Sequence, residues 1–241
     1  MAWGEPFGDT GTVATHVWLS PPPSGEDQGE IVYAGAFGDG DVIFRIALDD
    51  ITGPPVAVET DPEFTNIFCA GHCWLTDGRL LVAGGQLPGL ADEEEDQHEH
   101  GGMAGGGERA CWIYHPRTRA WIRTGSLNLA PDGAPNSGGR WYPTCVTLPD
   151  GRVLAVGGHP DIREEYHDPP NAPGHRHNNN IPEMFSPSTE TWTYLPDVRS
   201  APAGRVTDSY PRIHMLPNGT VFFATDPGGT KRHFDPYGET F

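Results

Sequence analysis

Short runs of apolar residues recur along the chain, and each follows a polar turn that ends in glycine. The turn glycines are Gly78, Gly151 and Gly219, and a weaker copy begins at Gly29. Because Asp-Gly and Asn-Gly adopt the positive φ that a two-residue turn needs, each turn predicts a tight β-hairpin. The runs that follow, at 80–83, 153–156 and 221–224, are apolar at nearly every position. Such continuous runs predict strands that are buried on both faces.

A second signal follows each hairpin: an aromatic residue, a proline two positions later, and another aromatic residue seven positions after the first. The aromatic pairs are Tyr114 and Trp121, Phe185 and Trp192, and Phe234 and Phe241. Proline followed by polar residues predicts a turn, and the aromatic rings are expected to pack on the flanking strands. Each repeat unit therefore predicts four short strands.

The repeats divide one continuous region, 1–241, into four units at 11–61, 67–123, 140–196 and 209–241. Sheets that stack face to face around an axis bury both faces of such strands. The pattern therefore predicts an all-β fold, a β-propeller of about four blades. Insertions near 86–109 and 159–180 are expected in loops on a propeller face. Because four blades close only a narrow ring, we expect the chain to be the N-terminal part of a larger propeller.

Composition agrees with a fold rich in turns and narrows the classes of partner. The 241 residues include 32 glycines and 25 prolines, and the formal net charge is −18. An acidic surface argues against a nucleic acid partner, because phosphate binding needs basic patches. No stretch approaches the roughly 18 apolar residues of a membrane span. No signal peptide is visible, which as written favours the cytoplasm. The four cysteines contain no CxxC pair and are expected to be free thiols.

Three residues share one position relative to the turns. Cys69, Tyr142 and Tyr210 each lie nine residues before the turn glycine of their own unit. In a propeller this position is the start of the first strand, which lines the central channel, and equivalent positions near the axis lie close together. We therefore expect Cys69 and Tyr142 to be neighbours at the channel mouth.

The segments FCAG at 68–71 and RWYPT at 140–144 resemble the copper radical oxidases, namely galactose oxidase and glyoxal oxidase, with the second segment closer to the glyoxal oxidase branch. The resemblance covers about 60–241 and extends more faintly over 11–60. It implies a seven-bladed kelch-type propeller, of which this chain holds about four blades. It also implies a thioether bond between Cys69 and Tyr142, with the joined phenol binding copper and carrying a radical.

The implied chemistry is a two-electron oxidation of a small aldehyde or primary alcohol, with O₂ reduced to H₂O₂. An ortho sulfur would lower the cost of removing an electron from the phenol, which agrees with this chemistry. The family's other copper ligands, a second tyrosine and two histidines, come from regions that have no counterpart in this chain. The tryptophan that stacks on the cofactor of galactose oxidase is replaced here by His159. The family is usually secreted, so the location stays open, as does the oligomeric state.

Other candidate residues have more ordinary interpretations. Tyr210 and Arg212 are candidates to line the substrate pocket, against simple channel lining. His98 and His100 could bind zinc or copper, and His175 and His177 could fold over the channel mouth, but solvated insertion loops are favoured for both pairs. His72 is expected to be a channel histidine.

Two rival functions stay open beside the oxidase. One is a non-catalytic kelch-type propeller that binds a protein or carbohydrate partner through its loops. The other is a relative that keeps the propeller and has lost the copper. An oxidase needs the link between Cys69 and Tyr142, and neither rival does.

Overall fold

The computed structural model describes residues 14–35, 41–87, 106–129, 138–160, 179, 181–195, 210–224 and 232–236. These residues form four antiparallel sheets, in each of which the strands follow chain order. The first sheet contains β1 (His16–Ser20), β2 (Glu30–Ala34), β3 (Ile43–Ala47) and β4 (Val56–Val58), with one short 3₁₀ turn, η2 (Leu48–Asp50). The second contains β5 (Gly71–Trp74), β6 (Leu80–Ala83), β7 (Cys111–His115) and β8 (Ala120–Thr124). The third contains β9 (Trp141–Thr147), β10 (Val153–His159), β11 (Glu183–Ser186) and β12 (Thr191–Tyr194). The fourth contains β13 (Ile213–Met215), β14 (Val221–Phe223) and β15 (Arg232–Phe234).

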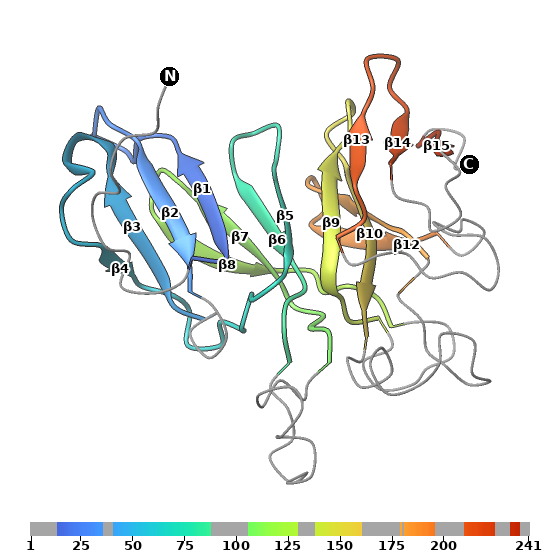
Figure 1. Cartoon of the computed structure of the whole chain (residues 1–241), viewed down its shortest axis with the longest axis horizontal. Helices are drawn as coiled ribbons and strands as arrows, with labels where there is room; N and C mark the ends of the chain where they lie inside the picture. The colour runs from blue at the N-terminus through green and yellow to red at the C-terminus, as the bar shows by residue number, and fades with distance from the viewer. Residues whose placement is uncertain are drawn as a thin grey trace, which may run out of the picture.

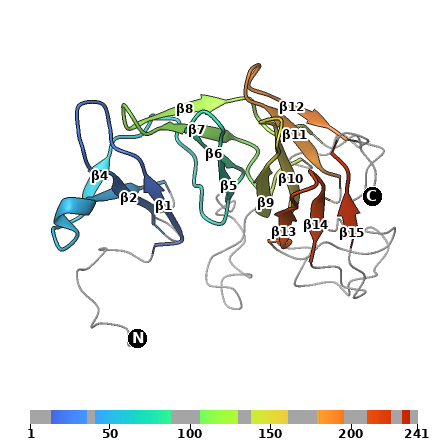
Figure 2. The same ribbon diagram turned by 90° about the horizontal axis from the view of Figure 1, so that it is seen from above.

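The expected all-β class is confirmed, and the four sheets succeed one another along the molecule (Figure 1). Seen from above, they form a curved row with the first strands β1, β5, β9 and β13 on its inner side (Figure 2). Within the part of the chain that the structure describes, no helix is long and apolar enough to cross a membrane.

The second strand of each inner sheet is buried on both faces, as its continuous apolar run predicts. In β6, Leu80 and Val82 pack against the first sheet, whereas Leu81 and Ala83 pack against the third. The strand β10 repeats this alternation between the second and fourth sheets. Neighbouring sheets are therefore held together by interleaved side chains rather than by strand pairing, and each of the three large core clusters belongs to two sheets.

The hairpin turns are longer than the Asp-Gly and Asn-Gly signals predict. Gly78 has a positive φ of 85°, but Asp77 does not, so the turn is not a two-residue turn with two positive φ angles. The amide of Gly78 donates to the carbonyl of Leu75 at 3.0 Å, and the amide of Leu75 donates to the carbonyl of Arg79 at 2.7 Å. The turns at Gly151 and Gly219 have the same bonds. A side-chain oxygen of Asp77 accepts from the Arg79 amide at 3.0 Å, which favours this wider turn.

The repeated aromatic pairs lie directly opposite each other across neighbouring strands. Tyr114 faces Trp121 with ring centroids 5.0 Å apart, and Phe185 faces Trp192 at 5.1 Å. The third pair cannot be followed, because Phe241 lies outside the described residues. The histidines at 98, 100, 175 and 177 in the two insertions also lie outside them.

Two histidines meet between the first and second sheets. The rings of His16 and His72 are 5.0 Å apart, and that of Trp18 lies 5.4 Å from His72. His72, which was expected to be a channel histidine, therefore packs between the first and second sheets. Burial lowers the pKa of His16 from 6.5 to about 3, with a further contribution from His72, against a hydrogen bond to the backbone of Ile67. Folding thus favours the neutral imidazole.

A buried ion pair joins the segment before β9 to β11. Arg140 Nη2 lies 3.0 Å from Glu183 Oε1, and both side chains are 0% exposed. The guanidinium also donates to the carbonyls of Gly157 and Ile181. The other carboxylate oxygen accepts from the backbone and side-chain nitrogens of Asn128 at 2.8 and 2.9 Å. Because each charge has several partners, the pair is compatible with burial.

Replacing Glu183 by glutamine tests how far the fold depends on this pair. The variant leaves a buried guanidinium without a counter-charge, so the free energy of unfolding should fall by about 3–5 kcal/mol. Urea unfolding followed by tryptophan fluorescence measures the change. As a control, Glu63→Gln removes an exposed ion pair with Arg123 and should cost less than about 1 kcal/mol. Equal losses would show that the buried pair is no more important than a surface pair.

Acid should weaken the contact between the first two sheets. Since the folded pKa of His16 is below its unfolded value of 6.5, this stabilisation falls as the pH drops from 6.5 toward about 3. At pH 4.5 the loss should be about 2–3 kcal/mol. The variant His16→Phe keeps an aromatic ring beside Trp18 and cannot titrate. Urea unfolding at pH 7 and at pH 4.5 measures the free energy of unfolding of both proteins. We expect the difference between the two pH values to be smaller in the variant than in the parent, by about 2–3 kcal/mol. An identical pH dependence in both proteins would contradict the assignment.

Candidate functional site

The three residues that share one repeat position are joined by their main chains. The amide of Tyr142 donates to the carbonyl of Cys69 at 2.9 Å, and the amide of Tyr210 donates to the carbonyl of Tyr142 at 2.8 Å. All three have positive φ angles, 59°, 64° and 49° in chain order. The expected juxtaposition of Cys69 and Tyr142 is therefore found, and Tyr210 extends the series. The functional roles of these residues stay predictions.

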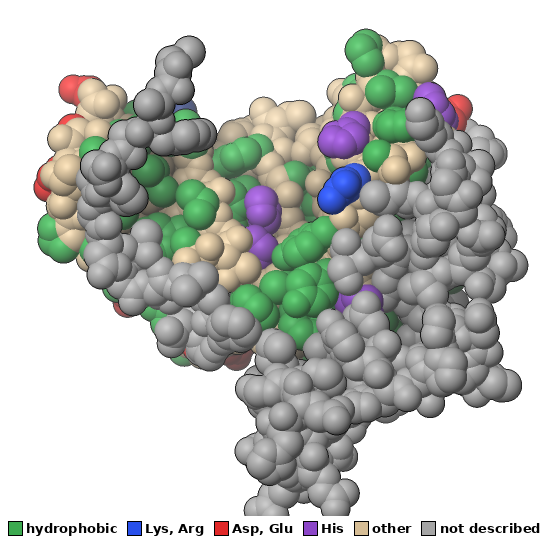
Figure 3. Space-filling view, in the orientation of Figure 1, with side chains coloured by type: hydrophobic (Ala, Val, Ile, Leu, Met, Phe, Trp, Pro, Cys, Tyr) green, Lys and Arg blue, Asp and Glu red, His purple; other side chains and the backbone are tan. Residues whose placement is uncertain are grey.

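The side chains of Tyr142 and Tyr210 lie against each other, with ring centroids 5.2 Å apart and an interplanar angle of 81°. The thiol of Cys69 is buried in a small cluster with Phe68 and Trp141, against which Tyr142 packs. Burial raises the pKa of the Cys69 thiol, and the neighbouring polar groups of Tyr142, Tyr210 and Trp141 partly oppose this rise. Hydrophobic and histidine side chains occupy the concave middle of this side of the molecule (Figure 3).

Two further rings enclose the ring of Tyr142. Trp141 stacks on it with centroids 4.6 Å apart and an interplanar angle of 28°. His159 meets it edge-on at 5.9 Å and 83°. With His159 in place of the family's tryptophan, the cover of Tyr142 was expected to come from elsewhere or to be missing, and Trp141 supplies it. The sequence signal for this stacking was the position of Trp141 directly before Tyr142. Because the positive φ at Tyr142 interrupts strand alternation, these consecutive side chains can lie on the same side of the strand.

The buried Arg140 fixes the backbone that carries Tyr142. Its amide donates to the carbonyl of Glu108, and its carbonyl accepts from the amide of Gly85, both at 3.0 Å. Gly84 has a φ of 78°, and a Cβ there would lie 2.2 Å from the Arg140 carbonyl oxygen. At Gly158, with a φ of 89°, a Cβ would lie 2.8 Å from that of Arg140. The repeated Gly-Gly pairs therefore permit the second and third sheets to approach the segment before Tyr142.

The described residues do not complete a metal site by themselves. No group of three or more His, Cys, Asp or Glu side chains that could hold a metal occurs among them. Tyr142 offers one phenolic oxygen. Arg212 is exposed, and its carbonyl accepts from the amide of Ala224 at 2.8 Å. A copper centre at Tyr142 would need ligands beyond those that the described residues bring together.

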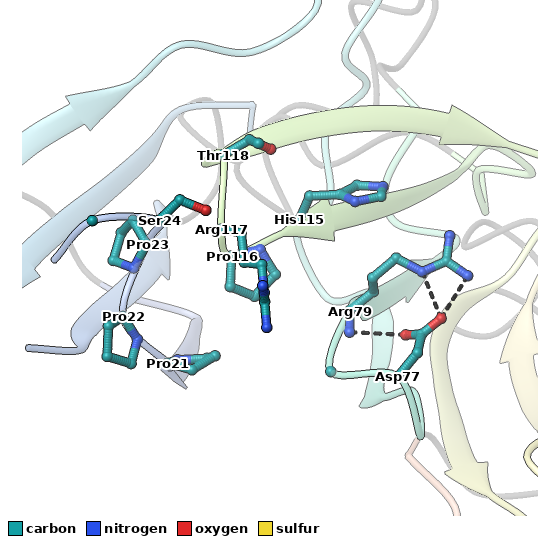
Figure 4. Close-up of a pocket in the computed structure, with 12 residues that line it drawn as sticks. Pro21, Pro22, Pro23, Ser24, Asp77, Arg79, His115, Pro116, Arg117 and Thr118 are labelled. Atoms are coloured by element: carbon teal, nitrogen blue, oxygen red, sulfur yellow. Dashed lines mark hydrogen bonds and ion pairs between the residues drawn. The ribbon is translucent and has the colours of Figure 1, made fainter. Parts of the chain in front are cut away.

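A second concave region lies at the other end of β5 from Cys69. Its volume is about 680 Å³, and Figure 4 shows prolines on one side and the ion pair of Asp77 and Arg79 on the other. Three turns form it, namely 21–25, 77–79 and 115–118. Arg79 is held by Asp77 at 2.8 Å and by Glu190 at 2.7 Å, so its charge is already compensated. This region contains none of the residues singled out for redox chemistry.

Comparison of sequences finds distant relatives. No protein-family model matches the chain. It is 28% identical over 158 residues to the aldehyde oxidase GLOX of Vitis pseudoreticulata, across 66% of this chain and 23% of that protein. It is 34% identical over 96 residues to a WSC domain-containing protein of Arthroderma benhamiae, across 39% of this chain and 9% of that protein. The chain spans about a quarter or less of the length of these curated relatives.

Comparison of structures gives related folds. A fungal alcohol oxidase of the AA5 family, in complex with copper, has a TM-score of 0.50 and 13% identity, covering 88% of this chain and 37% of that one. A protein of unknown function from Dyadobacter fermentans has a TM-score of 0.60 and 17% identity, covering 98% of this chain and 69% of that one. At these identities the structures support the fold alone. The chain therefore combines a weak sequence similarity to an aldehyde oxidase with a fold like that of a copper-bound alcohol oxidase.

Proposed function

We propose that this chain forms part of a copper radical oxidase-like protein that oxidises small aldehydes or primary alcohols with O₂. Its four sheets would be blades of a kelch-type β-propeller. The observation that carries the proposal is the contact between Cys69, which precedes β5, and Tyr142 of β9, joined by a main-chain hydrogen bond of 2.9 Å. The distant aldehyde oxidase and the copper-bound alcohol oxidase support the same reaction class.

The cofactor would be a thioether between these two residues. Its formation removes the hydrogen of the Cys69 thiol and one ring hydrogen of Tyr142, ortho to the hydroxyl, and forms one S–C bond. Two electrons and two protons are released, and O₂ accepts them to give H₂O₂. The buried sulfur of Cys69 is already packed with Tyr142, so the two partners need no large movement.

The surrounding residues prepare Tyr142 for one-electron chemistry. A sulfur ortho to the hydroxyl lowers the cost of removing an electron from the ring. Trp141 covers one face of the ring and excludes water from it, while Arg140 fixes the backbone on which both residues lie. Tyr142 is the ligand that this chain would offer to copper. Copper, when bound, supplies one electron equivalent of the substrate oxidation and the modified tyrosine supplies the other.

A mass measurement tests the thioether directly. The full-length gene product is treated with Cu²⁺ and O₂, unfolded, reduced, alkylated and digested with trypsin. Cleavage at arginine releases Cys69 in peptide 46–79 and Tyr142 in peptide 141–152. We expect one joined species that survives reduction and is two hydrogens lighter than the sum of the peptides, together with H₂O₂ release on adding aldehyde or alcohol.

The variant Cys69→Gly should lose both the joined peptide and the oxidase activity. Glycine accepts the positive φ of 59° at this position, so the backbone should be preserved. The matched control is Cys73→Ala, which removes another thiol of the same tryptic peptide and should leave coupling unchanged. Oxidation by Cys69→Gly at the parental rate would refute the radical cofactor. Absence of the joined species from the copper-treated parent would favour a binding role for the propeller.

A further inference from the structure

The concave region between the turns 21–25, 77–79 and 115–118, the turn pocket, is large enough for a small organic molecule. Its volume of about 680 Å³ lies within the range of pockets that bind small ligands. Its apolar lining comes from four prolines, namely Pro21, Pro22, Pro23 and Pro116. Two of them are buried and two are exposed, so the turn pocket offers proline ring surface to a molecule that enters it.

The walls of the turn pocket are tied together across two sheets. The amide of Ser24, in the connection between β1 and β2, donates to the carbonyl of Arg117 in the turn between β7 and β8 at 2.9 Å. Arg119, from the same turn, lies 2.8 Å from Glu26 and 2.6 Å from Glu30. Because these contacts belong to the fold itself, a ligand needs to order little of the chain when it binds.

Arg117 carries a charge that the fold leaves without a counter-charge. Its side chain is exposed and lines the turn pocket, and no described residue forms an ion pair or a hydrogen bond with its guanidinium. The other arginines of the second sheet all have such a partner, namely Arg79, Arg109, Arg119 and Arg123. In a chain with 33 acidic and 15 basic residues, an uncompensated arginine in a concave region favours an external anion as its partner.

The acidic groups beside the turn pocket restrict the charge of that anion. Arg79 lies 2.8 Å from Asp77 and 2.7 Å from Glu190, so one guanidinium already serves two carboxylates on this wall. A dianion would be repelled by the remaining negative charge. His115 and Thr118 add hydrogen-bonding groups to the lining without adding a further carboxylate. The charges therefore favour a ligand with a single negative charge.

We propose that the turn pocket binds a small monocarboxylate with an apolar body. The carboxylate would accept two parallel N–H bonds from the guanidinium of Arg117, a geometry for which arginine is suited. The apolar body would pack on the prolines, which lie on the opposite side of the turn pocket from the ion pair of Asp77 and Arg79 (Figure 4). The site contains neither Cys69 nor Tyr142 and does not depend on the proposed oxidase function.

Titration of the full-length protein with phenylacetate, followed by ligand-observed NMR, tests the site. Phenylacetate carries one carboxylate and one apolar ring, and we expect a dissociation constant of about 1 mM or lower. Arg117→Gln should raise this constant about five- to tenfold, because the charge-assisted bonds are lost. The matched control is Arg123→Gln, which removes an exposed arginine of β8 outside the turn pocket and should bind as the parent does.

The fold should tolerate the variant, because the Arg117 side chain makes no ion pair or hydrogen bond with the described residues. Urea unfolding of Arg117→Gln should therefore match that of the parent. Equal phenylacetate binding by the parent and Arg117→Gln overturns the proposal, as does an absence of binding to the parent at about 10 mM. Binding that is lost in Cys69→Gly and kept in Arg117→Gln also overturns it, because the ligand then occupies the site at Tyr142.

Two related probes separate the contribution of charge from that of apolar contact. Phenylacetamide keeps the shape of phenylacetate and is neutral, whereas acetate keeps the charge and lacks the ring. Each should bind to the parent at least about fivefold more weakly than phenylacetate. Equal binding of phenylacetamide and phenylacetate would contradict recognition of a carboxylate, and equal binding of acetate would contradict a role for the prolines.

Discussion

The buried ion pair between Arg140 and Glu183 fixes the part of the structure on which the candidate site depends. Both side chains are fully buried, and their remaining donors and acceptors are used by backbone groups and by Asn128. Because Arg140 comes two residues before Tyr142, the pair that ties β11 to this segment also sets the position of the phenol. The position of Arg140 also requires glycine at 84 and 158, because a side chain at either position would collide with Arg140.

Much of the fold could be predicted because each repeat contains a strand that must be buried on both faces. Leu80 to Ala83 are apolar at every position, and only a strand between two sheets buries such a run. The turn type was missed because the side-chain oxygen of Asp77 competes for the Arg79 amide, an effect that the Asp-Gly pair alone does not reveal. The packing of His72 against His16 was missed for a different reason: it depends on which face of β5 meets the first sheet, and the positive φ at Cys69 breaks the simple alternation.

The sequence predicted that Cys69 and Tyr142 are neighbours, but it did not predict which residues surround them. Cys69 and Tyr142 could be paired because a rotational repeat converts equal sequence spacing into spatial proximity. The ion pair of Arg140 with Glu183 has no such periodic signal, because it occurs once and joins residues 43 positions apart. The stacking of Trp141 on Tyr142 likewise depends on one local dihedral angle. Residues outside the repeat pattern can be assigned only when the three-dimensional contacts are known.

The positive φ angles at Cys69, Tyr142 and Tyr210 connect the fold to the proposed chemistry. Arg119 and Glu190 also have positive φ, but they occupy equivalent turn positions before β8 and β12, where chain reversal explains the angle. The three site residues instead precede or begin inner strands, and each carries a cost of about 1–2 kcal/mol relative to glycine. Glycine would satisfy the backbone at all three positions without that cost. A thiol and two phenols stand in these positions instead, joined by main-chain hydrogen bonds, and the proposed chemistry would give their strained backbone a function.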